Sequence, residues 1–386
     1  VKEGGTAASV CKACFGNGFG FKFANELTND ELFAPLSGSL VIELADGAEL
    51  SNDVLHYDLG TVTNDAKIAV NGKEIELSAL LEKWTAPLEK VFPTKAEVPE
   101  IEVDVPLYSE RNTSSPAIKT AKPTVFIPVF PGTNCEVDTA RAFEKAGANV
   151  EMLIVKNLSS NDIEETIDEM EKLIAKSQMI MLPGGFSGGD EPDGSGKFIA
   201  TTFRNPRIAE QVNNLLKNRD GLMLGICNGF QALIKLGLVP YGKIVGQTDD
   251  APTLTYNTIG RHISKMVYTK VVTNKSPWLQ GAQLGGVYTN PASHGEGRFV
   301  APKEWLDKLF ANGQVATQYC DLDGNVSMDE EWNINGSYMA IEGITSPDGR
   351  CFGKMAHSER RGDSVAINIY GEQDIKIFES GVKYFK

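Results

Sequence analysis

Residues 222–236 read LMLGICNGFQALIKL, an apolar run followed directly by a segment of helical content. The junction carries the pattern Gly225-x-Cys227-x-Gly229. Glycines on both sides of a nucleophile are typical of a sharp strand-to-helix turn, because side chains there would clash. The positive end of the following helix stabilises a thiolate. The stretch therefore predicts a nucleophilic Cys227, with the N–H of Asn228 facing a developing oxyanion. The alternative is a buried structural cysteine with incidental glycines.

Apolar runs alternate with helical segments on both sides of this stretch. Strands are expected at residues 124–130, 150–155, 179–182 and 222–227, and helices at residues 136–146, 163–174, 207–218 and 230–236. Continuous apolar strands separated by helices predict an α/β domain, in which a mainly parallel central sheet is covered by helices on both faces. Ligands bind such sheets at the carboxyl ends of the strands. The loops at Pro131, Pro183 and Cys227 all fall at these ends.

The chain divides by composition into three parts. Residues 96–122 mix Pro, Ser, Thr and charged residues without a lasting apolar period, so they are expected to form a linker. Residues 123–386 carry the α/β pattern, and residues 1–95 suggest a smaller α+β piece. In that piece strands are expected at residues 40–44, 67–70 and 74–77, and a helix at residues 80–91. Because the chain begins at Val1 in a glycine-rich phrase, we expect a fragment of a longer polypeptide or a processed chain.

The composition limits the possible partners. The 386 residues include 37 Lys and Arg against 51 Asp and Glu, a net charge of −14. This balance argues against a protein that coats nucleic acid or an anionic membrane, because both partners need a basic surface. No run approaches the ~18 apolar residues of a membrane span, and no signal-peptide pattern is visible. Six cysteines are too few for a disulfide scaffold, so reduced thiols in the cytoplasm are expected.

A cysteine nucleophile needs a base, and the candidates are the histidines. The chain has four, His56, His262, His294 and His357. Two of them share the pattern H-x-E, in His294-Gly-Glu296 and His357-Ser-Glu359, where the Glu could orient the imidazole. The pattern alone does not choose between the two. His294 lies in a glycine-rich phrase, whereas His357 follows a strand-like run, which is the firmer platform for a base. The other two histidines are expected to be ordinary polar residues.

Three further patterns carry weaker signals. Cys11-x-x-Cys14 has no second pair of zinc ligands and no preceding strand, so two packed thiols are expected and no metal. The glycine-rich stretch that begins at Gly184-Gly185 lacks the Lys-Ser/Thr of a phosphate-binding loop. It is a candidate for backbone oxyanion or substrate contacts, and an ordinary mobile loop is the alternative. Cys135 is expected to be structural.

Several phrases of the second part resemble one family. They are FPGTNCEVDTARAF (130–143), LPGGFSGGD (182–190), GICNGFQALIKLGL (225–238), SHGEGR (293–298) and MAHSER (355–360). Together they resemble a class I, triad-type glutamine amidotransferase domain. More narrowly, they resemble the glutaminase of formylglycinamide ribonucleotide amidotransferase, also called phosphoribosylformylglycinamidine synthase. Residues 1–95 resemble, more loosely, the C-terminal end of the synthetase in the large single-chain form of that enzyme.

The resemblance implies a role for each candidate site residue. The implied catalytic triad is Cys227, His357 and Glu359. The implied oxyanion contacts are Gly184, Gly185 and Asn228, and the implied glutamine contacts are Gln231, Ser293, His294 and Gly295. The chain departs from the family pattern at three positions. Ala356 and Ser358 stand where Pro is usual, which removes local stiffness, and Gly188 stands where Tyr is common.

The resemblance also implies an activity and its partners. The chain would hydrolyse L-glutamine and supply ammonia for the ATP-dependent conversion of formylglycinamide ribonucleotide to formylglycinamidine ribonucleotide in de novo purine biosynthesis. The implied partner is the rest of the synthetase, where ATP and Mg are expected; no cofactor is expected in this chain. Two other functions stay open. One is a γ-glutamyl or peptide hydrolase of the same α/β type, and the other is a docking module that is inactive without the synthetase.

Overall fold

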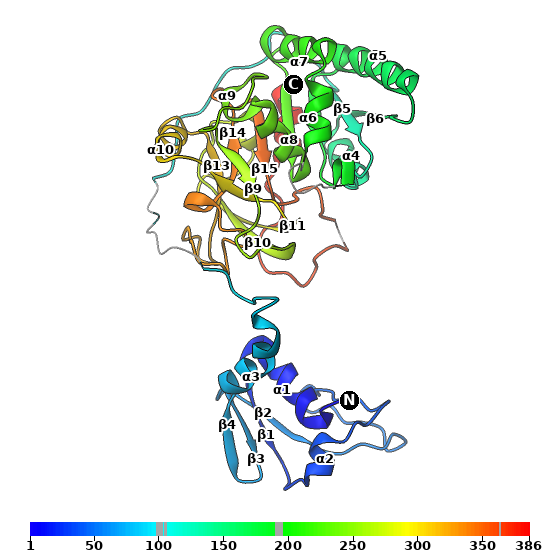
Figure 1. Cartoon of the computed structure of the whole chain (residues 1–386), viewed down its shortest axis with the longest axis vertical. Coiled ribbons are helices and arrows are strands. Elements are labelled where there is room, and N and C mark those ends of the chain that lie inside the picture. The colour runs from blue at the N-terminus through cyan, green and yellow to red at the C-terminus, as the bar shows by residue number, and fades with distance from the viewer. Residues whose placement is uncertain (98–102, 104–105, 190–195, 363) are drawn as a thin grey trace. The chain divides into compact units, whose positions relative to one another are not determined.

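The computed structural model of the chain describes residues 1–97, 103, 106–189, 196–362 and 364–386 (Figure 1). These residues form two compact units, Val1–Thr94 and Lys95–Lys386. Part of the linker predicted at 96–122, namely residues 98–102, 104 and 105, lies outside the described residues. Within the described ranges, no helix combines the length and the apolar composition needed to cross a membrane.

The first unit is a small α+β fold built on a sheet of order β2-β1-β3-β4, in which β1 and β3 are parallel. Its strands are β1 (Gly20–Phe23), β2 (Gly60–Thr63), β3 (Lys67–Val70) and β4 (Lys73–Glu76), and its helices are α1 (Gly5–Asn17), α2 (Asn29–Phe33) and α3 (Leu77–Glu89). Val10, Cys14, Phe21 and Ile68 belong to its buried core. Cys11 and Cys14 are free, and burial raises the pKa of both thiols, as packed thiols require.

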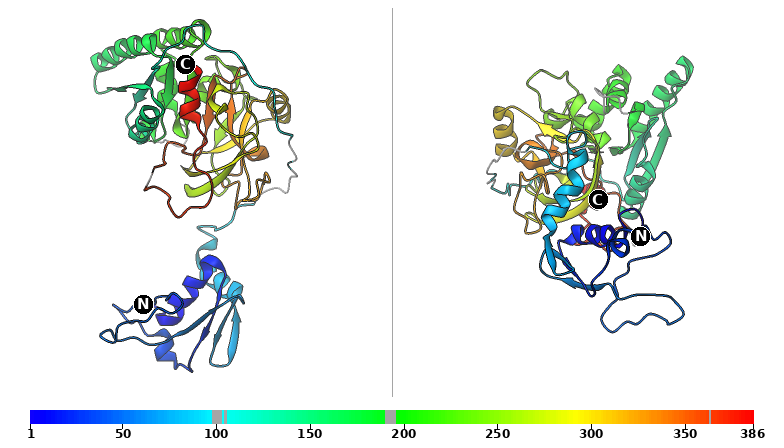
Figure 2. Two further views of the ribbon diagram at one scale, coloured as in Figure 1. Left: turned by 180° about the vertical axis from the view of Figure 1, so that it is seen from behind. Right: turned by 60° about the horizontal axis from the view of Figure 1, so that its bottom comes forward.

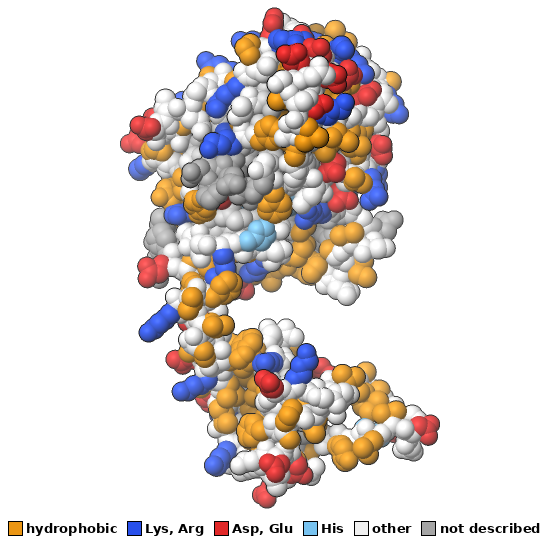
Figure 3. Space-filling model, turned by 45° about the vertical axis from the view of Figure 1, so that its right-hand side comes forward, with side chains coloured by type: hydrophobic (Ala, Val, Ile, Leu, Met, Phe, Trp, Pro, Cys, Tyr) orange, Lys and Arg blue, Asp and Glu red, His pale blue; other side chains and the backbone are white. Residues whose placement is uncertain are grey.

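One strand predicted in this unit is not formed. Residues 40–44, LVIEL, are irregular, and the Leu40 and Ile42 side chains are 83% and 54% exposed. The prediction was wrong because an apolar run becomes a strand only beside another strand, and no described strand pairs with this one. Figure 3 shows apolar side chains gathered on the surface of the unit.

The second unit is built on a nine-stranded sheet of order β11-β10-β13-β14-β15-β8-β7-β5-β6 in the described residues. The five strands from β6 to β15 are parallel and central to the fold. They are β5 (Thr124–Val129), β6 (Asn149–Ile154), β7 (Met179–Leu182), β8 (Leu222–Ile226) and β15 (Cys351–Lys354). The side chains of β7 and β8 are buried throughout, as a strand covered on both faces requires. The predicted α/β fold with a mainly parallel central sheet is confirmed.

Helices cover both faces of this sheet. They are α4 (Glu136–Ala146), α5 (Ser160–Lys176), α6 (Lys197–Phe203), α7 (Pro206–Asn218), α8 (Asn228–Leu236), α9 (Leu238–Tyr241), α10 (Lys303–Ala311) and α11 (Ile377–Tyr384), with short 3-10 turns at Ser187–Gly189, Pro277–Leu279 and Tyr338–Ala340. On one face α4 meets α11 through the rings of Phe143 and Phe378, 5.0 Å apart. The C-terminal helix is at the front in the reversed view of Figure 2. On the other face α5 packs on α7 and α6 packs on α8.

Four antiparallel strands extend the parallel half, and nothing in the sequence pattern indicated this extension. They are β10 (Ile263–Val271), β11 (Val287–His294), β13 (Val315–Tyr319) and β14 (Ile341–Thr345). A separate two-stranded sheet pairs β9 (Thr253–Thr255) with β12 (Arg298–Val300). The outer strands β10 and β11 partly alternate buried and more exposed residues, the pattern of a sheet with one solvated face, whereas β13 and β14 are buried throughout.

Candidate active site

The site is centred on the turn between β8 and α8. Cys227 has φ 53° and ψ −107°, a conformation that side-chain-bearing residues rarely adopt. A Cβ added to Gly225 would lie 2.6 Å from the backbone of Gly229, and one added to Gly229 would lie 1.9 Å from the Leu182 oxygen. Both flanking positions therefore exclude any larger residue. The strained turn predicted from the sequence is present, with the cysteine at its apex.

The histidine brought to this turn is His357. It follows β15, the parallel neighbour of β8, and the Cys227 N–H donates to the Lys354 oxygen at 2.8 Å. His357 Nδ1 lies 2.6 Å from Glu359 Oε1, and the Cys227 thiol is close enough for its charge to raise the pKa of His357. Because Nδ1 is engaged by the carboxylate, Nε2 is the ring nitrogen left for the thiol. All three side chains are buried.

The charges in this group favour a protonated histidine. Burial alone would lower the pKa of His357, but the negative charges of Glu359 and Cys227 outweigh it and raise that pKa well above its usual value. Burial would raise the pKa of Glu359, and the charge and hydrogen bond of His357 overcome this and lower it. The arrangement can therefore hold an imidazolium between a carboxylate and a thiolate.

A second cysteine lies on the other side of the base. Cys135, directly before α4, has its Sγ 3.7 Å from His357 Nδ1, and Arg360 Nη2 donates to that sulfur at 3.0 Å. The sequence signal was its place at the carboxyl end of β5, the same edge of the sheet as Cys227. The ligand atoms of Cys135, His357 and Glu359 all lie within 4.8 Å of one another, close enough to share a metal ion. A metal site is the less favoured interpretation, because the Arg360 guanidinium already bonds to the sulfur and Nδ1 already bonds to the carboxylate. These contacts instead fix the orientation of the His357 ring.

The other H-x-E histidine has a different environment. His294 Nδ1 lies 3.1 Å from Asn257 Oδ1, and Nε2 is buried and has no hydrogen-bond partner in the described part of the chain. Burial, with added repulsion from His357, lowers the pKa of His294 to about 3. His294 is therefore neutral near pH 7 and cannot serve as an acid there. Its neighbour Ser293 is closer to the nucleophile, with its backbone oxygen 3.7 Å from Cys227 Sγ.

The two side chains expected beside the nucleophile form an internal network. Asn228 Nδ2 donates to Gln231 Oε1 at 2.9 Å, and Gln231 Nε2 donates to the Glu296 oxygen at 2.7 Å. Asn228 Oδ1 accepts from the Ser187 N–H at 3.2 Å. Gln231 thus ties the turn at Cys227 to the loop after β11, and both ends of its amide are engaged by the protein.

The glycines of the neighbouring loops differ in how closely they are packed. A Cβ at Gly184 would lie 2.7 Å from His357 Cε1 and 3.1 Å from Cys135 Sγ, so only a glycine lets the base sit there. Gly185 has φ 142°, and a Cβ there would meet the backbone at Thr133. Gly295 has open space in the Cβ direction.

One histidine set aside as ordinary lies at the edge of this group. His262, on the exposed side, has its Nε2 3.0 Å from Ser293 Oγ, and its ring centroid is 6.1 Å from that of Phe186. Only the pairing of β10 with β11 brings it there, in the register of Ile263 with His294. The sequence carried no signal for this contact. His56, in the first unit, is exposed and bonded to the Val54 oxygen.

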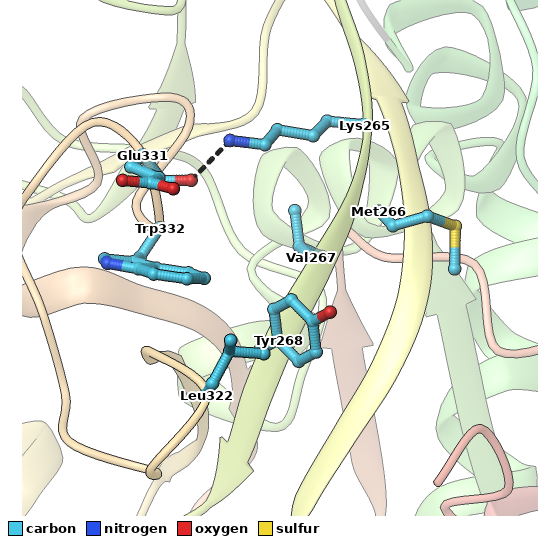
Figure 4. Close-up of a pocket in the computed structure, with 7 residues that line it drawn as sticks. All are labelled: Lys265, Met266, Val267, Tyr268, Leu322, Glu331 and Trp332. Carbon is cyan, nitrogen blue, oxygen red and sulfur yellow. Dashed lines mark hydrogen bonds between the residues drawn. The ribbon is translucent and has the colours of Figure 1, made fainter. Parts of the chain in front are cut away.

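Two cavities lie near the sheet. One of about 310 Å³ is away from the triad, between β10 and a loop, where the rings of Tyr268 and Trp332 meet and Lys265 donates to the Glu331 oxygen (Figure 4). The other, of about 500 Å³, is bordered by α4 and by the residues that follow the triad histidine, Glu359 among them. The buried group of Cys227, His357 and Glu359 combines a thiol, an imidazole and a carboxylate, the residue types that acyl transfer requires.

Comparison with known proteins assigns this fold to a class. Residues 122–385 match the family described as "CobB/CobQ-like glutamine amidotransferase domain". The chain belongs to this glutamine amidotransferase family.

Individual relatives of this chain carry a more specific name. The chain is similar to the phosphoribosylformylglycinamidine synthase subunit PurQ of Methanococcus maripaludis, with 32% identity over 286 residues, 68% of this chain and 97% of the relative. It is 34% identical to the subunit of the same name from Aquifex aeolicus over 239 residues, 61% of this chain and 90% of the relative. A solved structure, PurLQS from Thermotoga maritima, matches 69% of this chain and 100% of its own at 28% identity and a TM-score of 0.49.

Proposed function

We propose that this chain is the glutaminase of a phosphoribosylformylglycinamidine synthase and works through a triad of Cys227, His357 and Glu359. The observation that carries the proposal is that a thiol, an imidazole and a carboxylate are buried together just after two neighbouring parallel strands. The similarity to curated PurQ subunits over nearly their full length supports the substrate and the pathway.

The triad gives a concrete reaction. The Cys227 thiolate attacks the carboxamide carbon of L-glutamine, and the carbonyl electrons move onto oxygen. Backbone N–H groups of Asn228 and of the Gly184-Gly185 turn hold this oxyanion. Imidazolium His357 protonates the leaving ammonia as the C–N bond breaks, which leaves a γ-glutamyl thioester.

A second step frees the enzyme. His357, now neutral, takes a proton from water, whose oxygen attacks the thioester carbon. The C–S bond breaks, glutamate leaves, and the thiolate and imidazolium are restored. Glu359 holds the Nδ1 proton throughout. The loop of Ser293, His294 and Gly295 holds the amino acid end of glutamine, and Gln231 fixes that loop.

The ammonia released from glutamine would be used by a partner enzyme. We propose that it passes to a synthetase, which uses ATP and Mg to convert formylglycinamide ribonucleotide to formylglycinamidine ribonucleotide, so that the whole enzyme is a C–N bond-forming ligase. Curated relatives carry the word subunit in their name, which supports work with a partner. The first unit, by its resemblance to the end of a synthetase, favours a large single-chain form here.

Glutamate release from L-glutamine is the direct test, measured on this chain, Cys227→Ala, His357→Ala and His294→Ala. Loss in the first two variants, with a raised glutamine requirement in the third, supports the proposal. Loss of glutamate release in His294→Ala, with activity kept in His357→Ala, would show that His357 is not the base. A silent chain whose Cys227 is labelled by a glutamine-mimicking electrophile has a complete site that needs its synthetase. The absence of both turnover and labelling would favour the docking module. Cleavage of γ-glutamyl peptides but not of glutamine would favour the hydrolase.

A further inference from the structure

A buried ion pair lies directly beneath the base. Lys354, the last residue of β15, and Glu342, on β14, have fully buried side chains, and Lys354 Nζ is 3.3 Å from Glu342 Oε1. The two strands are adjacent and antiparallel. Neither residue was singled out in the sequence, because a lysine at the end of an apolar strand ordinarily extends to solvent.

The pair forms hydrogen bonds with the chain on both sides of His357. Lys354 Nζ donates to the Ala356 oxygen at 2.7 Å and to Ser358 Oγ at 3.1 Å. Glu342 Oε1 accepts from the Ala356 N–H at 2.6 Å. The residues immediately before and after the base are therefore fixed by one ammonium and one carboxylate.

The same lysine also holds the nucleophile. Its backbone oxygen accepts the Cys227 N–H at 2.8 Å, so a single residue touches both the turn with the thiol and the loop with the imidazole. The other oxygen of Glu342 accepts from the Thr317 hydroxyl on β13, which anchors the pair in the antiparallel half of the sheet.

Stability alone does not account for such a pair. Removing two charges from water costs several kcal/mol per ion, and replacing a whole buried pair by apolar or neutral groups is often neutral or stabilising. Apart from the Thr317 contact, the side-chain hydrogen bonds of Glu342 and Lys354 go to the loop that carries His357.

We propose that Lys354 and Glu342 are positioning residues that hold His357 at the Cys227 thiol. This inference rests on the proposed glutaminase function. The side chains of the pair bond to the residues on either side of His357, and the Lys354 backbone oxygen accepts the Cys227 N–H. Within the described residues, their other side-chain hydrogen bond is to Thr317, on the strand β13 and not in the loop at Gly295. The pair therefore acts on the chemical step rather than on glutamine binding.

The test is the double variant Lys354→Met/Glu342→Gln, which removes both charges and leaves no unpaired one. We expect unfolding in urea at the wild-type midpoint or above it. We expect kcat for glutamate release to fall on the order of 10-fold with KM unchanged, because a displaced base slows the reaction without changing the ground-state contacts. The matched control is Asp348→Asn/Arg350→Met, which removes the ion pair beside the opposite end of β15 and should leave kcat unchanged.

A rescue separates positioning from general packing. The Arg360 N–H donates to the His357 oxygen, so residues 357–360 form a turn with Ser358 at its second position. Proline is favoured at that position because its φ is already set. Adding Ser358→Pro to the double variant should restore most of the lost kcat.

A second readout does not depend on glutamine. The rate of Cys227 alkylation by iodoacetamide reports how well His357 activates the thiol. It should fall about 10-fold in the double variant and recover with Ser358→Pro. Unchanged kcat and alkylation in the double variant would overturn the inference, as would parallel loss of stability and kcat with no rescue. A wild-type chain that alkylates normally but never turns over glutamine would instead count against the proposed function, and the alkylation series would still decide the role of the pair.

Discussion

The backbone oxygen of Pro291 accepts a hydrogen bond of 2.8 Å from the N–H of His357. Pro291 belongs to β11, at the antiparallel edge of the sheet, whereas His357 follows the central strand β15. Three strands separate β11 from β15 in the sheet, so the antiparallel half must curl back over the carboxyl ends of the parallel strands. One half of the sheet thus supplies Cys227 and His357, and the other supplies the loop at Ser293.

Replacing the nucleophile should abolish turnover while leaving the fold intact. We expect Cys227→Ala to lower glutamate release by more than about 10³-fold, because no other group on the turn can form the thioester. The matched control is Cys11→Ala, in the first unit, which should behave as wild type. Coupled-assay kinetics and the urea midpoint measure the two effects. Retention of a tenth of the activity in Cys227→Ala would rule out the covalent mechanism.

The pH dependence of activity should report the Glu359 charge. The charge of that carboxylate contributes to raising the pKa of His357. In the proposed mechanism, protonated His357 is the acid that releases ammonia. Activity should therefore fall as pH rises through the His357 pKa. Removing the charge in Glu359→Gln lowers that pKa, so the alkaline limb of kcat/KM should move to lower pH. A limb that stays in place would show that another group titrates.

Gly184 should be required for the position of the base. A methyl group there would come within 2.7 Å of His357 Cε1, so Gly184→Ala should push the ring away from Cys227. We expect kcat to fall about 10²-fold, the effect of a displacement near 1 Å. Gly246→Ala is the matched control, because its Cβ would meet open space. Equal activity of the two variants would contradict the packing of His357 against this glycine.

Acid sensitivity should reside partly in His294. The pKa of His294 is about 3 in the folded chain and has an ordinary value near 6.5 in the unfolded chain. Below pH 6.5 the unfolded chain therefore binds a proton at His294 that the folded chain does not bind. The stability contributed by neutral His294 is complete above pH 6.5 and is lost as pH falls toward 3. Between pH 6.5 and 5 the loss is roughly 2 kcal/mol. In His294→Gln this loss should be absent. The free energy of unfolding, measured in urea at pH 6.5 and pH 5, should therefore fall by roughly 2 kcal/mol less than in the wild-type chain.

Local pattern was sufficient for the parallel half of the fold and for the reactive turn. The apolar runs of β5, β7 and β8 are continuous because these strands are buried on both faces, and Gly225 and Gly229 flank Cys227 because nothing larger fits. These features are encoded within a few residues of one another. The site roles stay predictions, both those of the triad residues Cys227, His357 and Glu359 and those of the oxyanion and glutamine contacts.

Contacts between distant segments could not be predicted in the same way. Cys135 and His357 are 222 residues apart, and His262 reaches Ser293 only through the pairing of β10 with β11. The strand expected at 40–44 failed for the same reason, since strand formation depends on a neighbour that local sequence does not reveal. The buried position of Lys354 likewise depends on Glu342, which lies on a different strand.

The positive φ of Cys227 implies a trade-off between reactivity and stability. Alanine is ordinarily the better residue and glycine the worse one, because glycine loses more freedom on folding. At φ 53° this order reverses, since only glycine adopts the conformation without steric cost. Cys227→Gly should therefore be more stable than Cys227→Ala, although both lack the sulfur. The chain keeps at Cys227 a side chain that its own backbone disfavours, and the proposed reaction gives a reason for keeping it.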